Sequence, residues 1–127
     1  MVAALAIVPA AADAAAPKLV KRSSGPLTAT LAPPARKPKI NTKVPIKVTA
    51  TLNGKPAHAT AVYEFLFLGS VVSTQNPYGK KHYSFTGHFS DNLVFPKSAV
   101  GQPLTFRVVV KARGRTVNLD APVTAQT

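Results

Sequence analysis

Alternating apolar and polar residues mark β-strands along most of this chain. From position 43 the sequence KVPIKVTATL places an apolar side chain at every second residue, from Val44 to Leu52. A period of two over this length predicts a strand with one buried face, and the β-branched residues favour the same assignment. Asn53 and Gly54 follow, and both tolerate positive φ, so we expect a tight turn after this strand.

The segment 61–72, AVYEFLFLGSVV, is apolar at nearly every position. Its length and its aromatic residues favour a single strand that is covered on both faces. Glu64 carries the only charge in it, and we expect this carboxylate to face outward at an edge or to pair with an arginine such as Arg107. The following STQNPYGKK contains Asn-Pro and Gly and predicts a loop over residues 71–81.

The second half of the chain contains three more alternating segments. Residues 82–95 predict a strand, in which Gly87 marks a bulge or a bend. Residues 104–112 and 116–123 lie on either side of the dipeptide Arg113-Gly114 and predict a hairpin. Its inner face is apolar and its outer face is mixed and basic, so we expect the hairpin to help close a core.

The N-terminal part of the chain differs in composition. Residues 1–16 combine an apolar stretch with A-x-A spacing, which predicts a secretory signal peptide whose basic start is missing; a short N-terminal helix is the alternative. We expect a flexible basic leader over residues 17–26 and a short edge strand at Leu27–Leu31. The prolines of residues 33–38 then predict a polyproline-like connection.

Taken together, these segments predict one all-β domain over residues 27–125, an antiparallel β-sandwich of about seven strands. The chain of 127 residues is long enough for one ordinary domain. It contains no cysteine, which excludes disulfides, thiolate metal sites and cysteine nucleophiles. It also contains no apolar run long enough to form a transmembrane helix.

Two stretches resemble a known class of domain. Residues 53–65, NGKPAHATAVYEF, resemble a strand junction of bacterial immunoglobulin-like (Ig-like) domains, and residues 100–123 resemble the closing hairpin of such domains. The resemblance implies an Ig-like or fibronectin-like sandwich in a secreted or cell-surface protein. Antibody-type domains carry a Cys…Trp…Cys signature, and this chain has neither residue.

Charge indicates the kind of partner. Sixteen Lys and Arg against four Asp and Glu give a formal net charge of +12, which favours attraction to polyanions. For a secreted chain we therefore expect an anionic envelope polymer or a protein partner, contacted by exposed cations. These candidate binding residues are Lys43, Lys47, Lys80, Lys81, Arg107, Lys111, Arg113 and Arg115, with Lys37 and Lys39 beside them.

Sequence motifs for catalysis, metal binding and specific nucleic-acid recognition are weak. His88, Ser90 and Asp91 lie within one predicted strand, whereas a catalytic triad normally draws on separate segments. His82 and His88 would lie about 20 Å apart along that strand, too far to share a metal ion. No nucleic-acid-binding signature is present, so we expect such binding to be non-specific.

The leading hypothesis is therefore a secreted, non-catalytic Ig-like binding or structural module at the cell envelope, without a cofactor. A secreted polyanion or nucleic-acid binder that acts through its basic surface is the alternative. An enzyme of unrecognised type would need a pocket that joins Glu64, Asp91 or Asp120 to a histidine.

Overall fold

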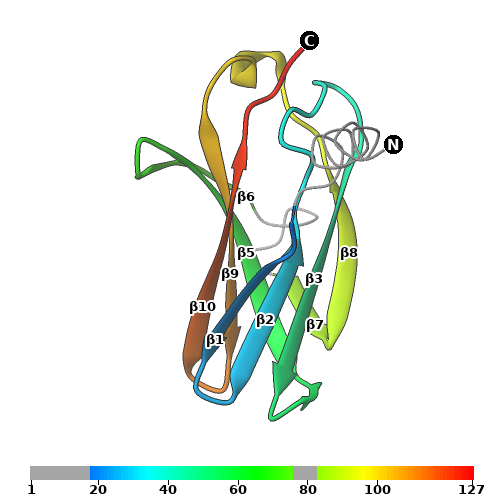
Figure 1. Cartoon of the computed structure of the whole chain (residues 1–127), viewed down its shortest axis with the longest axis vertical. Coiled ribbons are helices and arrows are strands. Elements are labelled where there is room, and N and C mark those ends of the chain that lie inside the picture. Colours follow the sequence, from blue (N-terminus) through cyan, green and yellow to red (C-terminus); the bar gives the residue numbers. More distant parts are fainter. Residues whose placement is uncertain (1–17, 76–82) are drawn as a thin grey trace, which may run out of the picture.

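Two antiparallel β-sheets form the molecule (Figure 1), and the computed structural model describes residues 18–75 and 83–127. The predicted signal peptide and the candidate residues Lys80, Lys81 and His82 lie outside the described residues. One sheet contains β1 (Val20–Ser24), β2 (Leu27–Ala32), β3 (Val44–Leu52), β4 (Lys55–Pro56) and β8 (His88–Leu93). The other contains β5 (His58–Phe67), β6 (Ser70–Gln75), β7 (Tyr83–Thr86), β9 (Leu104–Ala112) and β10 (Arg115–Val123).

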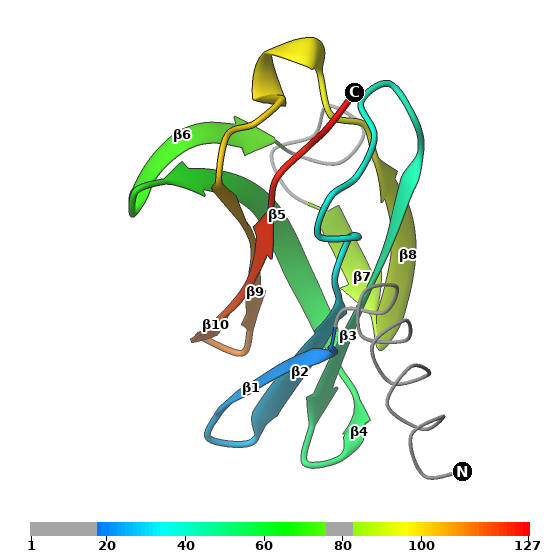
Figure 2. The same cartoon turned by 45° about the horizontal axis from the view of Figure 1, so that its top comes forward.

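The prediction of an all-β fold with two antiparallel, sandwich-like sheets is confirmed. The described residues form ten strands rather than about seven. In the first sheet the order is β1-β2-β3, and both β4 and β8 pair with the far edge of β3. In the second the order is β10-β9-β5, and both β6 and β7 pair with β5. Figure 2 shows how the sheets splay apart towards the end that carries the C-terminus.

The core lies between the sheets and is built by the predicted alternation. Along β3, Val44, Ile46, Val48 and Ala50 are buried, while Lys47 is exposed between them. Phe106 on β9 is fully buried, and its ring centroid lies 5.4 Å from that of Tyr63 and 5.3 Å from that of Phe65. Such aromatic contacts add to the stabilisation from burial.

The prediction of one strand over residues 61–72 is wrong. Two strands, β5 and β6, form a hairpin there, and the turn between them is Leu68-Gly69 with φ of 52° and 83°. Positive φ at both central residues is the backbone of a type I′ turn. The sequence conceals this turn because leucine stands where asparagine or aspartate would normally signal it.

The prediction of one strand over residues 82–95 is also wrong, although the expected bend at Gly87 is confirmed. β7 belongs to one sheet and β8 to the other, and Gly87, with φ of 80°, lies between them. Its N–H donates to the carbonyl of Ala57 at 2.9 Å, and its own carbonyl accepts from the N–H of Ala50 at 2.8 Å. The glycine thus carries the chain from one sheet to the other while its backbone stays hydrogen-bonded.

The structure differs from the expectation for the N-terminal region as well. Residues 20–24, which we expected in a flexible leader, form β1 and pair with β2 in an unbroken register from Val20↔Leu31 to Ser24↔Leu27. Residues 27–31 are therefore an inner strand and not the edge that we expected. Pairing overrides the polar composition of β1, whose sequence is VKRSS. Within the described residues, no helix is both long enough and apolar enough to span a bilayer.

Candidate functional site

The structure distributes the candidate cations over separate surfaces. Lys47 lies on the outer face of the first sheet, whereas Arg107 and Lys111 lie on β9 in the second. Arg113 is in the β9–β10 turn, and the Arg115 guanidinium packs over Gly25, where an added Cβ would approach its Nη1 to 2.6 Å. Those predicted residues that the structure describes are therefore spread over both sheets and the β9–β10 turn.

Arg107 is engaged by carboxylates. It lies between Glu64 on β5 and Asp120 on β10 in one row across the sheet. Its Nε donates to Asp120 Oδ1 at 2.8 Å, its Nη2 donates to Oδ2 at 3.0 Å, and its Nη1 lies 3.8 Å from Glu64 Oε1. The expected pairing of Glu64 with Arg107 is confirmed. With two carboxylates beside it, Arg107 has no excess positive charge to offer an anion.

The strands β1 and β10 lie next to each other on one side of the sandwich (Figure 1), and a basic cleft is lined by residues of both. Its volume is about 410 Å³, and the opposite wall is formed by Asp120, Ala121 and Pro122 of β10. Four cations line it: Lys18, Lys21, Arg22 and Arg36. We refer to these four residues, with Asp120, as the basic cleft.

Backbone pairing fixes the walls of the basic cleft. Lys21 and Arg22 are held by the register of β1 against Thr30 and Ala29 of β2. On the connection after β2, the carbonyl of Arg36 accepts a hydrogen bond of 2.8 Å from the N–H of Thr124, just after β10. Lys21, Arg22 and Arg36 therefore project from a positioned backbone rather than from a free N-terminal extension.

The electrostatics of the basic cleft favour an anion. Among the described residues, every ion pair involves Arg107, so the four lysines and arginines of the cleft face no carboxylate within 4 Å. Asp120 is the one acid in the lining, and Arg107 already neutralises it. Cations that lack acidic neighbours on a concave surface raise the local concentration of anions.

The basic surface continues onto the outer face of the first sheet. Lys21 stands in one row with Thr30, Thr49 and His88, and the next hydroxyl-bearing row contains Ser23, Thr28 and Thr51. A second hollow of about 420 Å³ is lined by Lys47, Ser90, Asn92 and one acid, Asp91, and Pro33 borders both this hollow and the basic cleft. Cationic and hydrogen-bonding side chains thus follow one another over an extended track.

Asp91 and His58, two of the residues considered for catalysis or metal binding, are each within hydrogen-bonding distance of another side chain of the fold. The hydroxyl of Tyr63 donates to Asp91 Oδ2 at 2.8 Å, and Asp91 Oδ1 accepts from the N–H of Asn92 at 2.8 Å. His88 projects from the outer face of the sheet, so His88, Ser90 and Asp91 do not form a triad. His58 Nδ1 instead lies 3.2 Å from the hydroxyl of Thr86.

Nor does the described part of the chain gather metal ligands. Within residues 18–75 and 83–127, no three His, Asp or Glu side chains lie close enough together to hold a metal ion. The basic cleft contains Asp120 but no histidine. The second hollow, which we call the Lys47 hollow, contains Asp91 but no histidine. Among the described residues, neither hollow brings a histidine next to its carboxylate.

Comparison with known proteins leaves the geometry as the guide to function. No family model, curated protein or solved structure matches this chain. The cations of the basic cleft were not among the binding residues that we predicted, because their segment has the composition of a solvated extension. Their clustering in the sequence, as Lys18, Lys21 and Arg22, is the signal that could have identified them.

Proposed function

We propose that this protein is a secreted, non-catalytic Ig-like module of the cell envelope that binds an anionic polymer through the basic cleft. The sandwich-like sheets, together with the resemblance of residues 53–65 and 100–123 to Ig-like domains, support the assignment to that class. The signal-like sequence of residues 1–16 supports secretion. The observation that carries the binding function is that Lys18, Lys21, Arg22 and Arg36 all line one cleft.

A polymer suits this surface better than a single small anion. The basic cleft and the Lys47 hollow meet at Pro33, so successive charged groups along one polymer molecule contact both. Lysine and arginine supply charge-assisted hydrogen bonds to phosphate or carboxylate oxygens. Hydroxyls of the outer face, such as that of Ser90, supply hydrogen bonds to neighbouring polar groups of the polymer.

Retention of the full chain on two immobilised polymers across a salt series tests this function. One polymer is a poly(glycerol phosphate) of the bacterial envelope, and the other is double-stranded DNA. We expect retention on the envelope polymer to persist near physiological salt, while retention on DNA disappears by about 0.2 M. Equal loss from both polymers would contradict the proposal, because the charge would then act only as generic attraction and a protein partner would have to be sought.

A further inference from the structure

Exposed apolar side chains gather at one corner of the molecule. Leu68, Val71 and Val72 belong to the β5–β6 hairpin and are 84%, 49% and 57% exposed, while Val94 follows β8 and is 58% exposed. We call these four residues the apolar corner. The hairpin projects from the side of the sandwich (Figure 1), so its turn stands clear of the two sheets. Single exposed hydrophobic residues are common, whereas a cluster of this kind indicates a binding surface.

The apolar corner continues into a hollow. Val72 and Val94 line a cavity of about 360 Å³ together with the aromatic rings of Phe65, Phe67 and Phe95. Pro96, Ser98 and Ala99, in and next to the short 3₁₀ helix η2 (Lys97–Ala99), form another part of the wall. The apolar surface therefore extends from the hairpin turn to the base of η2.

The residue at the hairpin turn is unusual for its position. Three turns of this protein have the same backbone, with a non-glycine residue at φ of 52° followed by a glycine at positive φ: Asn53-Gly54, Leu68-Gly69 and Arg113-Gly114. Two of them carry a polar residue at the first position, as solvent exposure favours. Leu68 is disfavoured both by its left-handed backbone and by its exposed apolar side chain. An apolar partner outside the chain would account for it.

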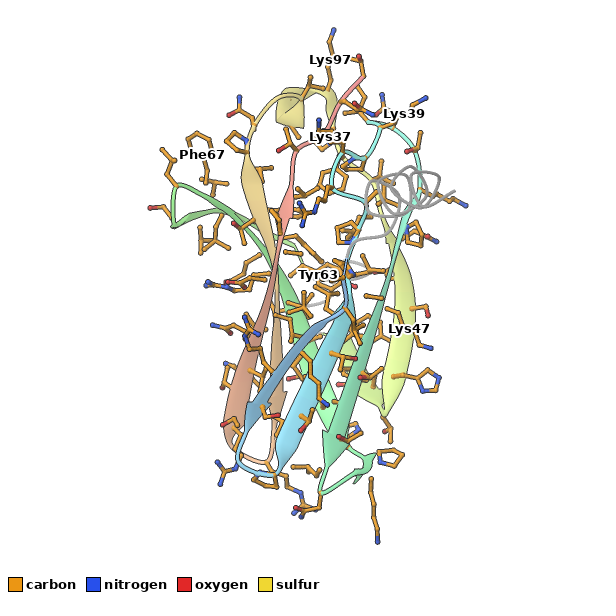
Figure 3. All side chains as sticks on the ribbon, viewed as in Figure 1. Lys37, Lys39, Lys47, Tyr63, Phe67 and Lys97 are labelled. Carbon is orange, nitrogen blue, oxygen red and sulfur yellow. The ribbon has the colours of Figure 1, made fainter. Side chains whose placement is uncertain are left out.

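The segments beside the apolar corner are basic. Lys97 lies between two residues that line the hollow, and the neighbouring connection of residues 33–43 carries Lys37, Lys39 and Lys43. The N–H of Asn41 donates to the carbonyl of Phe95 at 3.0 Å, which holds that connection next to the hollow. Figure 3 shows Lys97, Lys37 and Lys39 at the same end of the sandwich as Phe67. Residues 33–43, 65–75, 94–103 and 124–127 contain no acid.

We propose that the apolar corner docks onto an anionic lipid bilayer. Leu68, Val71 and Val72 enter the boundary between headgroups and acyl chains, and the cations around Lys97 contact the anionic headgroups. An apolar surface beside lysines and arginines is the combination that binds peripheral proteins to anionic membranes. This docking surface is distinct from the basic cleft. Experiments can therefore refute membrane docking by the apolar corner without refuting polymer binding by the cleft, and the reverse also holds.

A tryptophan at the turn tests the docking directly, because the chain contains no tryptophan of its own. Leu68→Trp puts the probe in the apolar corner. Asn53→Trp is the matched control: it has the same φ of 52°, is followed by a glycine and changes no charge, but it lies in the turn after β3, at the opposite end of the sandwich. The full chain is used in both variants, so residues 1–17 are the same in each.

With vesicles of phosphatidylglycerol and phosphatidylcholine, we expect the emission of the Leu68→Trp variant to shift to shorter wavelength and to be quenched by brominated acyl chains. The emission of the Asn53→Trp variant should not change. No shift in either variant would overturn the proposal and would leave a protein as the occupant of the corner. Equal shifts in both would also overturn it, because adhesion would then be independent of orientation.

A second variant separates docking from folding. Leu68→Asn places a favoured residue in the turn, so the hairpin should remain folded while the apolar side chain is lost. We expect co-sedimentation with the same vesicles to weaken by roughly tenfold, and Lys97→Gln to weaken it by roughly fivefold. Unchanged binding of the Leu68→Asn variant would overturn the proposal. Equal binding of the unmodified chain to phosphatidylcholine vesicles alone would overturn the requirement for anionic lipid.

Discussion

Arg107 and Asp120 form a two-point hydrogen bond across the β9–β10 ladder, at 2.8 Å from Nε to Oδ1 and 3.0 Å from Nη2 to Oδ2. This hydrogen bond is the main cause that raises the pKa of Arg107 above its ordinary value, and the nearby charges of Asp120 and Glu64 act in the same direction. The pairing matters for function because Asp120 is also the one acid in the lining of the basic cleft. Arg107 thus acts on the cleft by neutralising a charge that would repel an anion.

Removal of the arginine should therefore weaken polymer binding although Arg107 lines no part of the basic cleft. In the Arg107→Gln variant the carboxylate of Asp120 is left to repel a bound anion. At a separation of about 5 Å in a water-like medium, this repulsion corresponds to roughly a three- to fivefold loss of affinity. Titration calorimetry with poly(glycerol phosphate) measures it.

The opposite substitution provides the control. Asp120→Asn removes the carboxylate and should strengthen binding by a similar factor, since Arg107 then contributes positive charge near the cleft. Both variants should lose only about 0.5–1 kcal/mol of folding free energy, because the pair is partly exposed to solvent. Equal weakening in both variants would show that the ion pair contributes only to structure.

Gly87 should tolerate a side chain poorly. An added Cβ would lie 3.1 Å from the Cβ of Pro56, and φ at this position is 80°. We expect Gly87→Ala to lower the free energy of unfolding by about 2 kcal/mol, from the left-handed backbone together with this close contact. Urea denaturation followed by circular dichroism measures the loss.

Gly101→Ala separates these two effects. Gly101 has a similar φ of 77°, but an added Cβ meets no atom within 4 Å. This variant should therefore lose only the backbone contribution, about 1 kcal/mol. If the two alanine variants were equally stable, the close approach of Pro56 to the sheet crossing would not contribute.

The hydrogen bond from Tyr63 to Asp91 links β5 in one sheet to β8 in the other. Tyr63 is only 2% exposed, so loss of its hydroxyl leaves the carboxylate with one partner fewer near the core. We expect Tyr63→Phe to destabilise the fold by about 1–2 kcal/mol and to leave polymer binding unchanged. A fall in affinity without a fall in stability would indicate that the Tyr63 hydroxyl positions Asp91 in the Lys47 hollow for binding.

The fold class could be predicted from the sequence because alternation is a local property. Period two identifies the buried face of β3 and of the β9–β10 hairpin without knowledge of their neighbours. Strand ends could not be found in this way where the turn lacks the residues that normally mark a turn. The break at Leu68-Gly69 lies inside a continuous apolar run, and the crossing at Gly87 leaves the alternation of residues 82–95 intact.

The candidate site was less predictable, for a physical reason. Net charge shows that anions are attracted, but it does not show which cations converge and which are already paired. Arg107 was predicted both as a binding residue and as a partner of Glu64, and only the register shows that Asp120 flanks it on the other side. The segment with Lys21 and Arg22 looked like a solvated extension, because only the pairing of β1 with β2 brings it against β10.

The most direct test of the basic cleft compares two double variants that remove the same charge. Lys21→Gln with Arg22→Gln alters the cleft, whereas Lys55→Gln with Lys111→Gln alters exposed lysines elsewhere. The measurement is the affinity for poly(glycerol phosphate) at a series of salt concentrations between about 50 and about 200 mM. We predict that the cleft variant binds at least tenfold more weakly and that its salt slope falls by about two, while the control changes less than twofold. Equal losses in both variants would contradict a defined binding cleft and would leave only the overall charge of the protein.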